Sequence, residues 1–332
     1  MSLLDRESSS KQSTHAHCLT EWTALSIMGS ETTDLLNRLL TLNVKSLAVG
    51  EGGCAFLLDH RGRVREVFWL VKSSADTYHA ITELSASRLR DAIDMFIFSE
   101  DVTLEVLSSR CVYMWNISSD DPAGLDDEEL WTLDAAADAL DLDVPCFSLG
   151  QERLRLVDPS SVIHHVEALS QSGSVEYTIA QLEMFRIRSG APAARDYRGE
   201  PSPLDISRRG ISEGKGCYPG QEVIERTLAL GKPAQITAQA ILVVESQALE
   251  ALTTLYQSDT TLPIYLRDDQ SESPKLIGEV TSLTVPDASA GSATEVSCSA
   301  IVRVKRSAQE RALCVGMQEL RLDVMLGERL TF

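Results

Sequence analysis

The sequence lacks several features that would place it in common classes of protein. None of its seven cysteines forms a C-x-x-C pair and their number is odd, so neither a zinc site nor a self-contained iron–sulfur site is predicted. No hydrophobic run approaches the length of a membrane span. The polar first residues lack the apolar core of a signal peptide. These absences favour a reducing, cytoplasmic location, where most cysteines are small buried side chains.

Basic residues are also in deficit, with 30 Lys and Arg against 49 Asp and Glu and a formal net charge of -19. A surface this acidic repels nucleic acid and anionic lipid, so we expect no direct nucleic-acid partner and no membrane partner. A local basic pocket for one anionic small molecule remains compatible with this charge, because net charge does not fix the field inside a cleft. The length of 332 residues predicts more than one packed unit.

The pattern of apolar residues predicts an α+β fold in two stretches. Residues 22–107 alternate between strand-like and helix-like periods, which predicts a sheet with helices on one face. Ser30 is expected to cap the first helix. After about residue 235, short strands separated by turn-rich joints predict a small antiparallel barrel or sandwich. The clearest expected elements are strands over Trp22–Met28, Cys54–Leu58, Val67–Lys72 and Val102–Val106, and helices over Glu83–Ile97 and Tyr177–Arg188.

One segment combines turn signals with a reactive side chain. Pro219 and Gly220 suit the two central positions of a type II turn, the second of which needs a positive φ. Cys217 lies just before this turn between glycines that let the backbone approach a ligand closely. Lys215 and Arg226 are near enough in sequence to favour its thiolate, although neither is a general base. A simple turn around a buried cysteine is an equal alternative for these residues taken alone.

The whole string Lys215-Gly-Cys-Tyr-Pro-Gly-Gln-Glu222 resembles the signature K-G-C-Y-x-G-Q-E of the YgfZ-type folate-binding proteins. These proteins belong to the superfamily of the glycine-cleavage T-protein, an aminomethyltransferase, and have relatives that assist iron–sulfur cluster assembly. Weaker matches extend the resemblance over nearly the full chain. They are a first helix within Gly29–Leu47, an Asp-x-x-Gly hairpin within Leu57–Val64, an R-I-x-x-G-x-P element within Phe185–Pro192 and a G-x-V-T-S strand within Ile277–Ser282.

The resemblance implies an aminomethyltransferase-like body of two intertwined α/β subdomains plus a C-terminal antiparallel β-barrel. The expected division is a flexible N-terminus over residues 1–20, a folate-binding region over 21–235 and the barrel over 236–332. Within the folate-binding region, one subdomain comprises 21–110 with 191–235, and the other comprises 111–190.

The implied cofactor is tetrahydrofolate or a derivative, with no metal, and the implied partners are folate and client iron–sulfur proteins. The implied function is support of the assembly or repair of iron–sulfur proteins, and through them of tRNA modification. Cys217 carries over as the key thiol. The expected cofactor-binding residues are Lys215, Tyr218, Gln221, Glu222, Arg226 and Arg188.

Two departures from the T-protein pattern argue against authentic aminomethyltransferase activity. Arg188 stands where that branch has an acidic residue, and Arg65-Glu66 stands where it keeps an aspartate. Glu66 is either a replacement carboxylate or, as favoured here, an exposed charge at a strand end. Arg208 and Arg209 form either a solvated turn or an attractor for carboxylates. A folate-dependent one-carbon transferase or demethylase and a non-catalytic folate sensor therefore remain as alternative functions, and enzyme status stays open.

Overall fold

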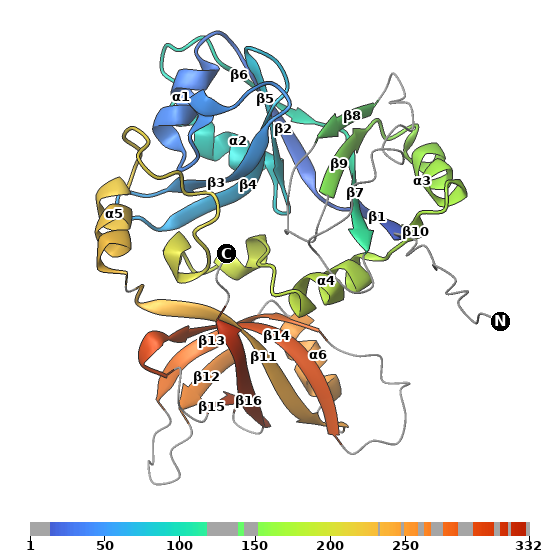
Figure 1. Ribbon diagram of the computed structural model, residues 1–332, viewed down its shortest axis with the longest axis vertical. Helices are drawn as coiled ribbons and strands as arrows, with labels where there is room; N and C mark the ends of the chain where they lie inside the picture. The colour runs from blue at the N-terminus through green and yellow to red at the C-terminus, as the bar shows by residue number, and fades with distance from the viewer. Residues whose placement is uncertain are drawn as a thin grey trace, which may run out of the picture.

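The computed structural model shows a mixed α+β protein and describes residues 14–117, 139–142, 152–231, 233–246, 249–257, 262–266, 275–284, 295–308, 313–317 and 320–329. Figure 1 shows two α/β parts side by side, with a β-rich part formed by the C-terminal strands beneath them. Among the described residues, no helix has both the length and the hydropathy needed to cross a bilayer.

The first sheet has the strand order β3-β4-β5-β2-β6. Its two faces both bury apolar side chains, because residues of both parities in β4 are inaccessible. Helices α1 and α2 pack through Leu35, Leu36 and Leu89 on one face. The elements are β2 (Thr23–Met28), α1 (Thr32–Leu39), β3 (Gly52–Leu58), β4 (Val64–Lys72), β5 (Thr77–Thr82), α2 (Ala86–Asp94) and β6 (Thr103–Leu107).

The expected cap of α1 is wrong in detail. The residue before the helix is Glu31, whose side chain makes no capping hydrogen bond. The Ser30 hydroxyl instead donates to Asp101 Oδ2 at 2.7 Å, so a carboxylate that precedes β6, the strand paired with β2, binds this hydroxyl in place of the helix N-terminus.

The second sheet has the order β10-β1-β7-β9-β8 and corrects the prediction of a flexible N-terminus through residue 20. Residues Thr14–Thr20 form β1, which pairs along its whole length with β7 and buries Ala16 and Cys18. An alternation of small apolar residues with polar ones over so short a stretch was masked by its serine-rich surroundings. The other elements are β7 (Arg110–Ile117), β8 (Ala139–Leu142), β9 (Glu152–Val157), α3 (Val162–Gln171) and β10 (Val175–Glu176).

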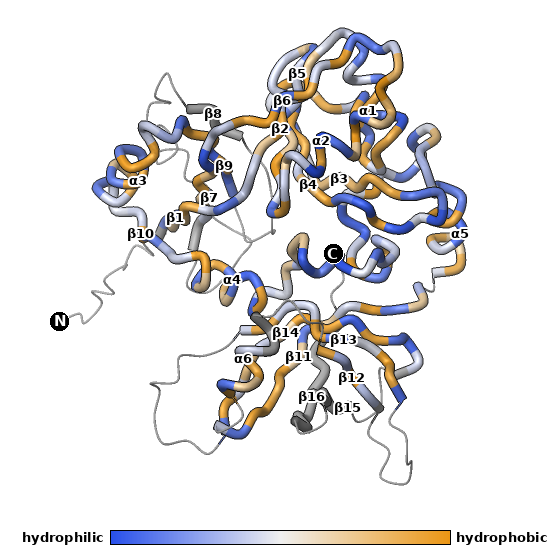
Figure 2. The backbone as a smooth tube through the Cα atoms, turned by 180° about the vertical axis from the view of Figure 1, so that it is seen from behind, coloured by the Kyte–Doolittle hydropathy of each residue, from blue (hydrophilic) through white to orange (hydrophobic). Residues whose placement is uncertain are grey.

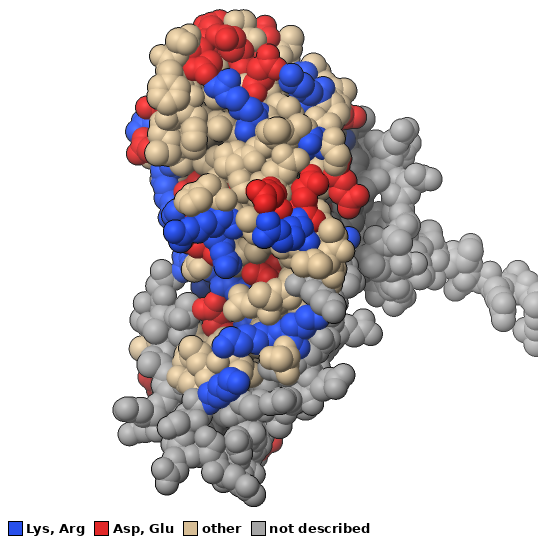
Figure 3. All heavy atoms as spheres, turned by 90° about the vertical axis from the view of Figure 1, so that its left-hand side faces the viewer, with Lys and Arg blue, Asp and Glu red and all other residues tan. Residues whose placement is uncertain are grey.

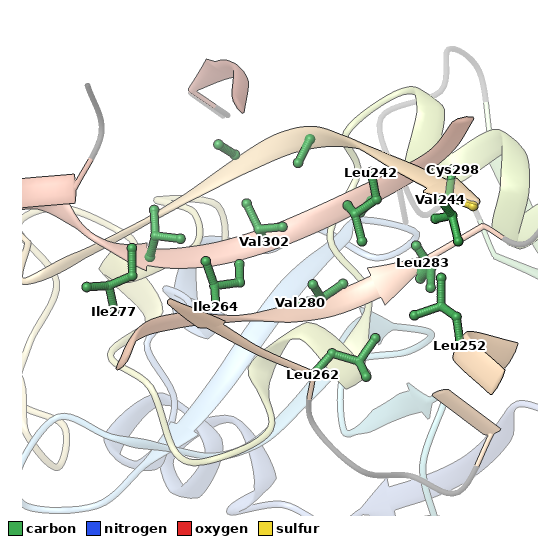
Figure 4. Close-up of a cluster of buried hydrophobic side chains, with 14 of the residues drawn as sticks. Leu242, Val244, Leu252, Leu262, Ile264, Ile277, Val280, Leu283, Cys298 and Val302 are labelled. Carbon is green, nitrogen blue, oxygen red and sulfur yellow. The ribbon is translucent and has the colours of Figure 1, made fainter. Parts of the chain in front are cut away.

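The C-terminal strands pair antiparallel in the order β11-β14-β13-β12-β15-β16, and β16 pairs back with β11. Their inward side chains form an aliphatic cluster that includes Leu242, Val280 and Val302, with Leu252 from α6 beside it (Figure 4). The elements are β11 (Gln235–Glu245), α6 (Leu249–Gln257), β12 (Leu262–Leu266), β13 (Leu276–Leu283), β14 (Glu295–Lys305), β15 (Leu313–Met317) and β16 (Leu320–Arg329).

The segment between the second sheet and the C-terminal strands returns to the first sheet. Helix α4 (Ile179–Arg188) begins with a capping box between Thr178 and Gln181. Two short 3₁₀ turns follow, η2 (Ala194–Tyr197) and η3 (Pro203–Asp205), and then α5 (Gln221–Leu230). The backbone N–H of Ser212 donates to Thr41 O at 3.0 Å. We propose on this basis that residues 21–110 and 191–235 form one subdomain, as the resemblance implies.

Candidate functional site

The turn before α5 has the geometry expected of its residues. Gly220 has φ 77° and ψ 1°, and the N–H of Gln221 donates to Tyr218 O at 3.2 Å. These values define a type II turn with proline at its second position and glycine at its third. Gly220 is also the residue that precedes the first turn of α5, so one residue both ends the loop and starts the helix.

This turn is locked against the Asp-x-x-Gly hairpin between β3 and β4. A Cβ added to Gly220 would lie 2.5 Å from Asp59 O and 2.6 Å from Gly62 Cα, which no side chain tolerates. The hairpin is held by its own aspartate, because Asp59 Oδ1 accepts the N–H groups of Arg61 and Arg63 at 2.8 and 2.9 Å. Two motifs that lie about 160 residues apart in the chain therefore meet backbone to backbone.

Lys215 is buried and contacts the C-terminal end of α1. Its Nζ donates to Asn37 O at 2.7 Å and to Leu40 O, two carbonyls that the helix leaves without intrahelical donors. The same ammonium group lies 5.1 Å from the centre of the Tyr218 ring. Burial lowers the pKa of Lys215 to about 8. Its hydrogen bonds thus go to the C-terminal end of a helix.

Tyr218 and Gln221 hold the loop from the inside. Tyr218 is buried in an apolar cluster with Phe56, Tyr197 and Ile224, and burial raises its pKa to about 12. The Gln221 side-chain amide donates to Glu225 Oε1 at 2.9 Å and to Lys215 O at 3.4 Å. Both predicted binding residues therefore shape the loop.

The remaining signature residues face outward. Cys217 is exposed, whereas Cys18, Cys111 and Cys298 are buried and Cys54 is intermediate. Arg226 pairs with Glu222 at 2.7 Å along the exposed surface of α5. Figure 3 views the side on which α5 lies in Figure 1, and basic and acidic side chains are interleaved there. The two cations predicted to favour a Cys217 thiolate, Lys215 and Arg226, are thus both engaged with other partners.

A hollow lies between the first sheet and the returning segment. Its walls include Cys54 of β3, Trp69 of β4, Ala194 and Tyr197 of η2, and Arg209. Figure 2 shows the hydrophobic stretches of β3 and β4 in the middle of the molecule. Arg209 reaches this wall, whereas Arg208 is exposed. Cys217 is not among the lining residues, so the predicted thiol and the hollow are separate features.

Two titratable wall residues, Cys54 and Tyr197, lie close to the carboxyl group of Glu83, which does not itself line the hollow. Burial raises the pKa of the Cys54 thiol to about 12, with Arg209 opposing the rise and Glu83 adding to it. Burial also raises the pKa of Tyr197 well above its ordinary value, and Glu83 contributes there too. Glu83 itself has a pKa of about 8, chiefly through burial. Glu83 follows an ordinary strand in the sequence, so its position gave no indication that its carboxyl group is buried.

One sequence expectation about a charged residue needs correction. Glu66 is not an exposed strand-end charge; it is buried, and it accepts a hydrogen bond from Arg88 Nε of α2 at 2.6 Å. Burial raises the pKa of Glu66, and Arg88 opposes the rise. Arg188, predicted to bind cofactor, is exposed at the end of α4, and its carbonyl accepts from Gln239 at 2.8 Å.

The buried arginine of this element is Arg186. It donates to Asp196 Oδ2 at 3.1 Å, Ala191 O at 2.9 Å and Ser282 Oγ at 3.0 Å, and forms an ion pair with Glu183. The arginine of the R-I-x-x-G-x-P element thus joins α4, η2 and β13. Among the described residues, no group of three or more His, Cys, Asp or Glu side chains is arranged to hold a metal ion.

Comparison with solved structures defines the class of fold. The crystal structure of the glycine cleavage system aminomethyltransferase T from Bartonella henselae superposes with a TM-score of 0.70, over 96% of this chain and 86% of that chain, at 12% sequence identity. The α+β architecture is therefore that of the aminomethyltransferases, as predicted.

Comparison of sequences points to a narrower class of protein than the fold does. The tRNA-modifying protein YgfZ of Aliivibrio fischeri (strain MJ11) is 23% identical over 219 residues, which are 63% of this chain and 65% of that protein, so the match spans slightly less than two thirds of the relative. No family model matches the chain. The two similarities confirm the predicted resemblance to YgfZ-type proteins of the T-protein superfamily.

Proposed function

We propose that this protein binds tetrahydrofolate or a derivative in the hollow beside Trp69 and Tyr197, and that it supports the assembly or repair of iron–sulfur proteins through the Cys217 thiol. The role extends through those clients to tRNA modification, in a reducing, cytoplasmic compartment. The similarity to a tRNA-modifying protein and to an aminomethyltransferase fold supports this proposal.

The proposed role of Cys217 rests on the contrast between buried and exposed residues within the signature. Lys215 and Tyr218 are buried, and Gly220 is wedged against the hairpin. The same tightly held loop leaves the Cys217 sulfur exposed. A loop held so rigidly around one exposed nucleophile is suited to presenting that nucleophile to a large partner, because little ordering entropy is lost when the partner binds.

The residues that line the hollow offer chemistry that suits a pterin ring. Trp69 and Tyr197 offer aromatic surface for a flat heterocycle, and Arg209 offers a cation for a glutamate carboxylate. Bound folate supplies one-carbon-carrier chemistry. The chain's own residues would bind the ring, orient it and exclude water from it.

The transferase alternative is less well supported by the geometry. It needs a carboxylate that is free to steer a protonated folate nitrogen. Glu66, the replacement candidate, is held by Arg88 and is not among the residues that line the hollow. The proposed thiol function therefore accounts better for the side chains that are available.

The test combines ligand binding with rescue in cells. We expect tetrahydrofolate to change the intrinsic tryptophan fluorescence saturably, because Trp69 lies in the wall. Cys217→Ala should keep that change but abolish rescue of iron–sulfur enzyme activity in cells that lack a YgfZ-type protein. Glu213→Gln, an exposed change in the same loop, is the matched control and should rescue fully. Full rescue by Cys217→Ala would contradict the thiol role, and absence of saturable binding would contradict the folate role.

A further inference from the structure

One side of α5 presents apolar side chains to solvent. Val223, Arg226 and Leu230 recur at intervals of three and four residues, so they lie along one stripe of the helix. Ile224 turns inward and is fully buried. Leu230, by contrast, is 66% exposed and Val223 is 38% exposed, so no described element covers this stripe.

The exposed apolar surface continues onto the C-terminal strands. Arg306, directly after β14, donates from its guanidinium group to Gly231 O at 3.1 Å, the carbonyl that follows Leu230. The neighbouring Lys305 donates from Nζ to Leu276 O at 3.4 Å. Leu276, the first residue of β13, is 54% exposed. Two exposed leucines from distant segments thus flank one pair of cations, and apolar surface rimmed by charge is typical of an interaction site.

Several cations along this surface form no ion pair within the described part of the chain. Arg61 is exposed at the tip of the Asp-x-x-Gly hairpin, where a Cβ added to Gly62 would lie 3.3 Å from Val223 Cβ of α5. Lys275 is exposed beside β13. The side chains of Lys305 and Arg306 donate to carbonyl groups alone.

The carboxylates of α5 are already engaged. Glu222 pairs with Arg226 at 2.7 Å, and Glu225 accepts from Gln221 at 2.9 Å. The loop before the helix adds one exposed carboxylate, Glu213. Figure 3 shows basic side chains on this side both at the level of α5 and over the C-terminal strands below it. The surface is therefore rich in uncompensated cations although the whole chain has a formal net charge of -19.

We propose that this surface, which runs from the hairpin tip and Cys217 along α5 to the start of β13, docks an acidic segment of a client iron–sulfur protein that carries apolar side chains among its carboxylates. The inference rests on the proposed function and adds the chemistry of the segment that brings a client to Cys217. Helix α5 has 10 residues and is about 15 Å long. About five residues of an extended segment span that distance.

A protein segment suits this surface better than a nucleic acid does. Phosphate groups would pair with the cations but leave Leu230 and Leu276 without apolar contacts, whereas an acidic segment with apolar side chains satisfies both. The net charge of -19 also repels a long polyanion over the rest of the molecule, and a short segment meets mainly the local cations.

The first experiment measures thiol exchange between Cys217 and a peptide with three repeats of Glu-Glu-Leu, ending in a cysteine that carries a thionitrobenzoate group. The Cys217 thiolate attacks the peptide sulfur, a new disulfide forms, and thionitrobenzoate leaves and is followed by its absorbance. The rate should saturate with peptide. Below saturation it should exceed that of the matched Gln-Gln-Leu peptide about tenfold, because docking raises the local concentration of the disulfide. Cys217→Ser measures the background from other cysteines.

Variants of the surface locate the docking. Leu230→Asp and Arg306→Glu each place a carboxylate on it and should slow exchange with the acidic peptide about fivefold or more. Neither should change the rate with the small thionitrobenzoate disulfide reagent. Ile163→Asp is the matched control, because Ile163 is 71% exposed on α3, and it should exchange at the wild-type rate. Added salt should slow exchange with the acidic peptide alone.

Three outcomes would overturn the docking surface. One is equal rates with the acidic and neutral peptides, and another is exchange at the wild-type rate in both Leu230→Asp and Arg306→Glu. The third is stronger inhibition of the exchange by a single-stranded RNA of equal charge than by the unlabelled acidic peptide, which would show that the surface binds nucleic acid.

Rescue in cells that lack a YgfZ-type protein separates this inference from the proposed function. Leu230→Asp should restore less iron–sulfur enzyme activity than Ile163→Asp, with an unchanged tetrahydrofolate titration. Full rescue by Leu230→Asp together with failure of Cys217→Ala would remove the docking role and leave the thiol role intact. Full rescue by Cys217→Ala would remove the thiol role itself.

Discussion

At the scale of single residues, glycine at position 220 satisfies two independent constraints. Its φ of 77° lies in the left-handed region, and the space beside its Cα is filled by Asp59 O and Gly62 Cα. Gly214 meets only the first constraint, because its φ is 69° but nothing lies within 4 Å of an added Cβ. The two positions thus separate the cost of backbone conformation from that of steric overlap.

Gly220→Ala should lower the free energy of unfolding by about 3 kcal/mol or more, since backbone atoms of the hairpin must move to admit the methyl group. Gly214→Ala should cost only about 1 kcal/mol. Urea denaturation of the two variants measures both values. Equal costs would show that the contact between the turn and the hairpin contributes nothing to stability.

At the scale of elements, α1 depends on a side chain that is distant in the sequence. Its leucine stripe predicts the helix, but Lys215, about 180 residues further on, supplies donors to its last carbonyls. A cation at this position also interacts favourably with the negative end of the helix dipole. The signature lysine therefore has a structural role that is sufficient to explain its burial.

Lys215→Met should remove both hydrogen bonds and lower the free energy of unfolding by about 2 kcal/mol, because two carbonyls lose a charged donor. Lys45→Met is the matched control; Lys45 forms an exposed pair with Asp34 at 2.7 Å and should matter by less than about 0.5 kcal/mol. Chemical denaturation compares the variants. An effect no larger than that of the control would indicate that Lys215 is retained for ligand binding rather than for the helix.

At the scale of the whole molecule, Asp196 joins the segment after α4 to the C-terminal strands. It accepts from Arg186 and Ala193 on one side and from Thr281 and Ser282 of β13 on the other. Arg303 of β14 donates to its carbonyl at 2.9 Å. The aspartate is fully buried, so its charge is compensated only by these partners.

Asp196→Ala should cost about 3–5 kcal/mol, because Arg186 loses one of its two counter-charges. Backbone hydrogen exchange should accelerate in β13 and β14 more than in β3 and β4, which make no hydrogen bond to Asp196 in the described structure. Glu222→Gln, at an exposed pair, is the control. Uniform acceleration across all strands would mean that Asp196 stabilises the body as a whole rather than this joint.

Much of the fold followed from local pattern. The strand over Trp22–Met28, the helix ending at Arg188 and the turn at Pro219-Gly220 all lie where sequence periodicity and turn chemistry predicted them. Glu66 and Ser30 were misjudged because their surroundings come from residues far away in the chain, Arg88 and Asp101. The N-terminal strand was missed because its alternation is short and lies in serine-rich surroundings, and because its stability comes from pairing with β7.

The sequence by itself determined the conformation of the signature turn, since a proline beside a glycine dictates its dihedral angles. It also determined the resemblance of this segment to the YgfZ-type signature. Only the tertiary structure decided which of its side chains are exposed, because burial depends on the hairpin and the helix end that pack against the loop. It also separated the exposed Cys217 from the hollow, since the walls of the hollow come from β3, β4 and the segment that follows α4.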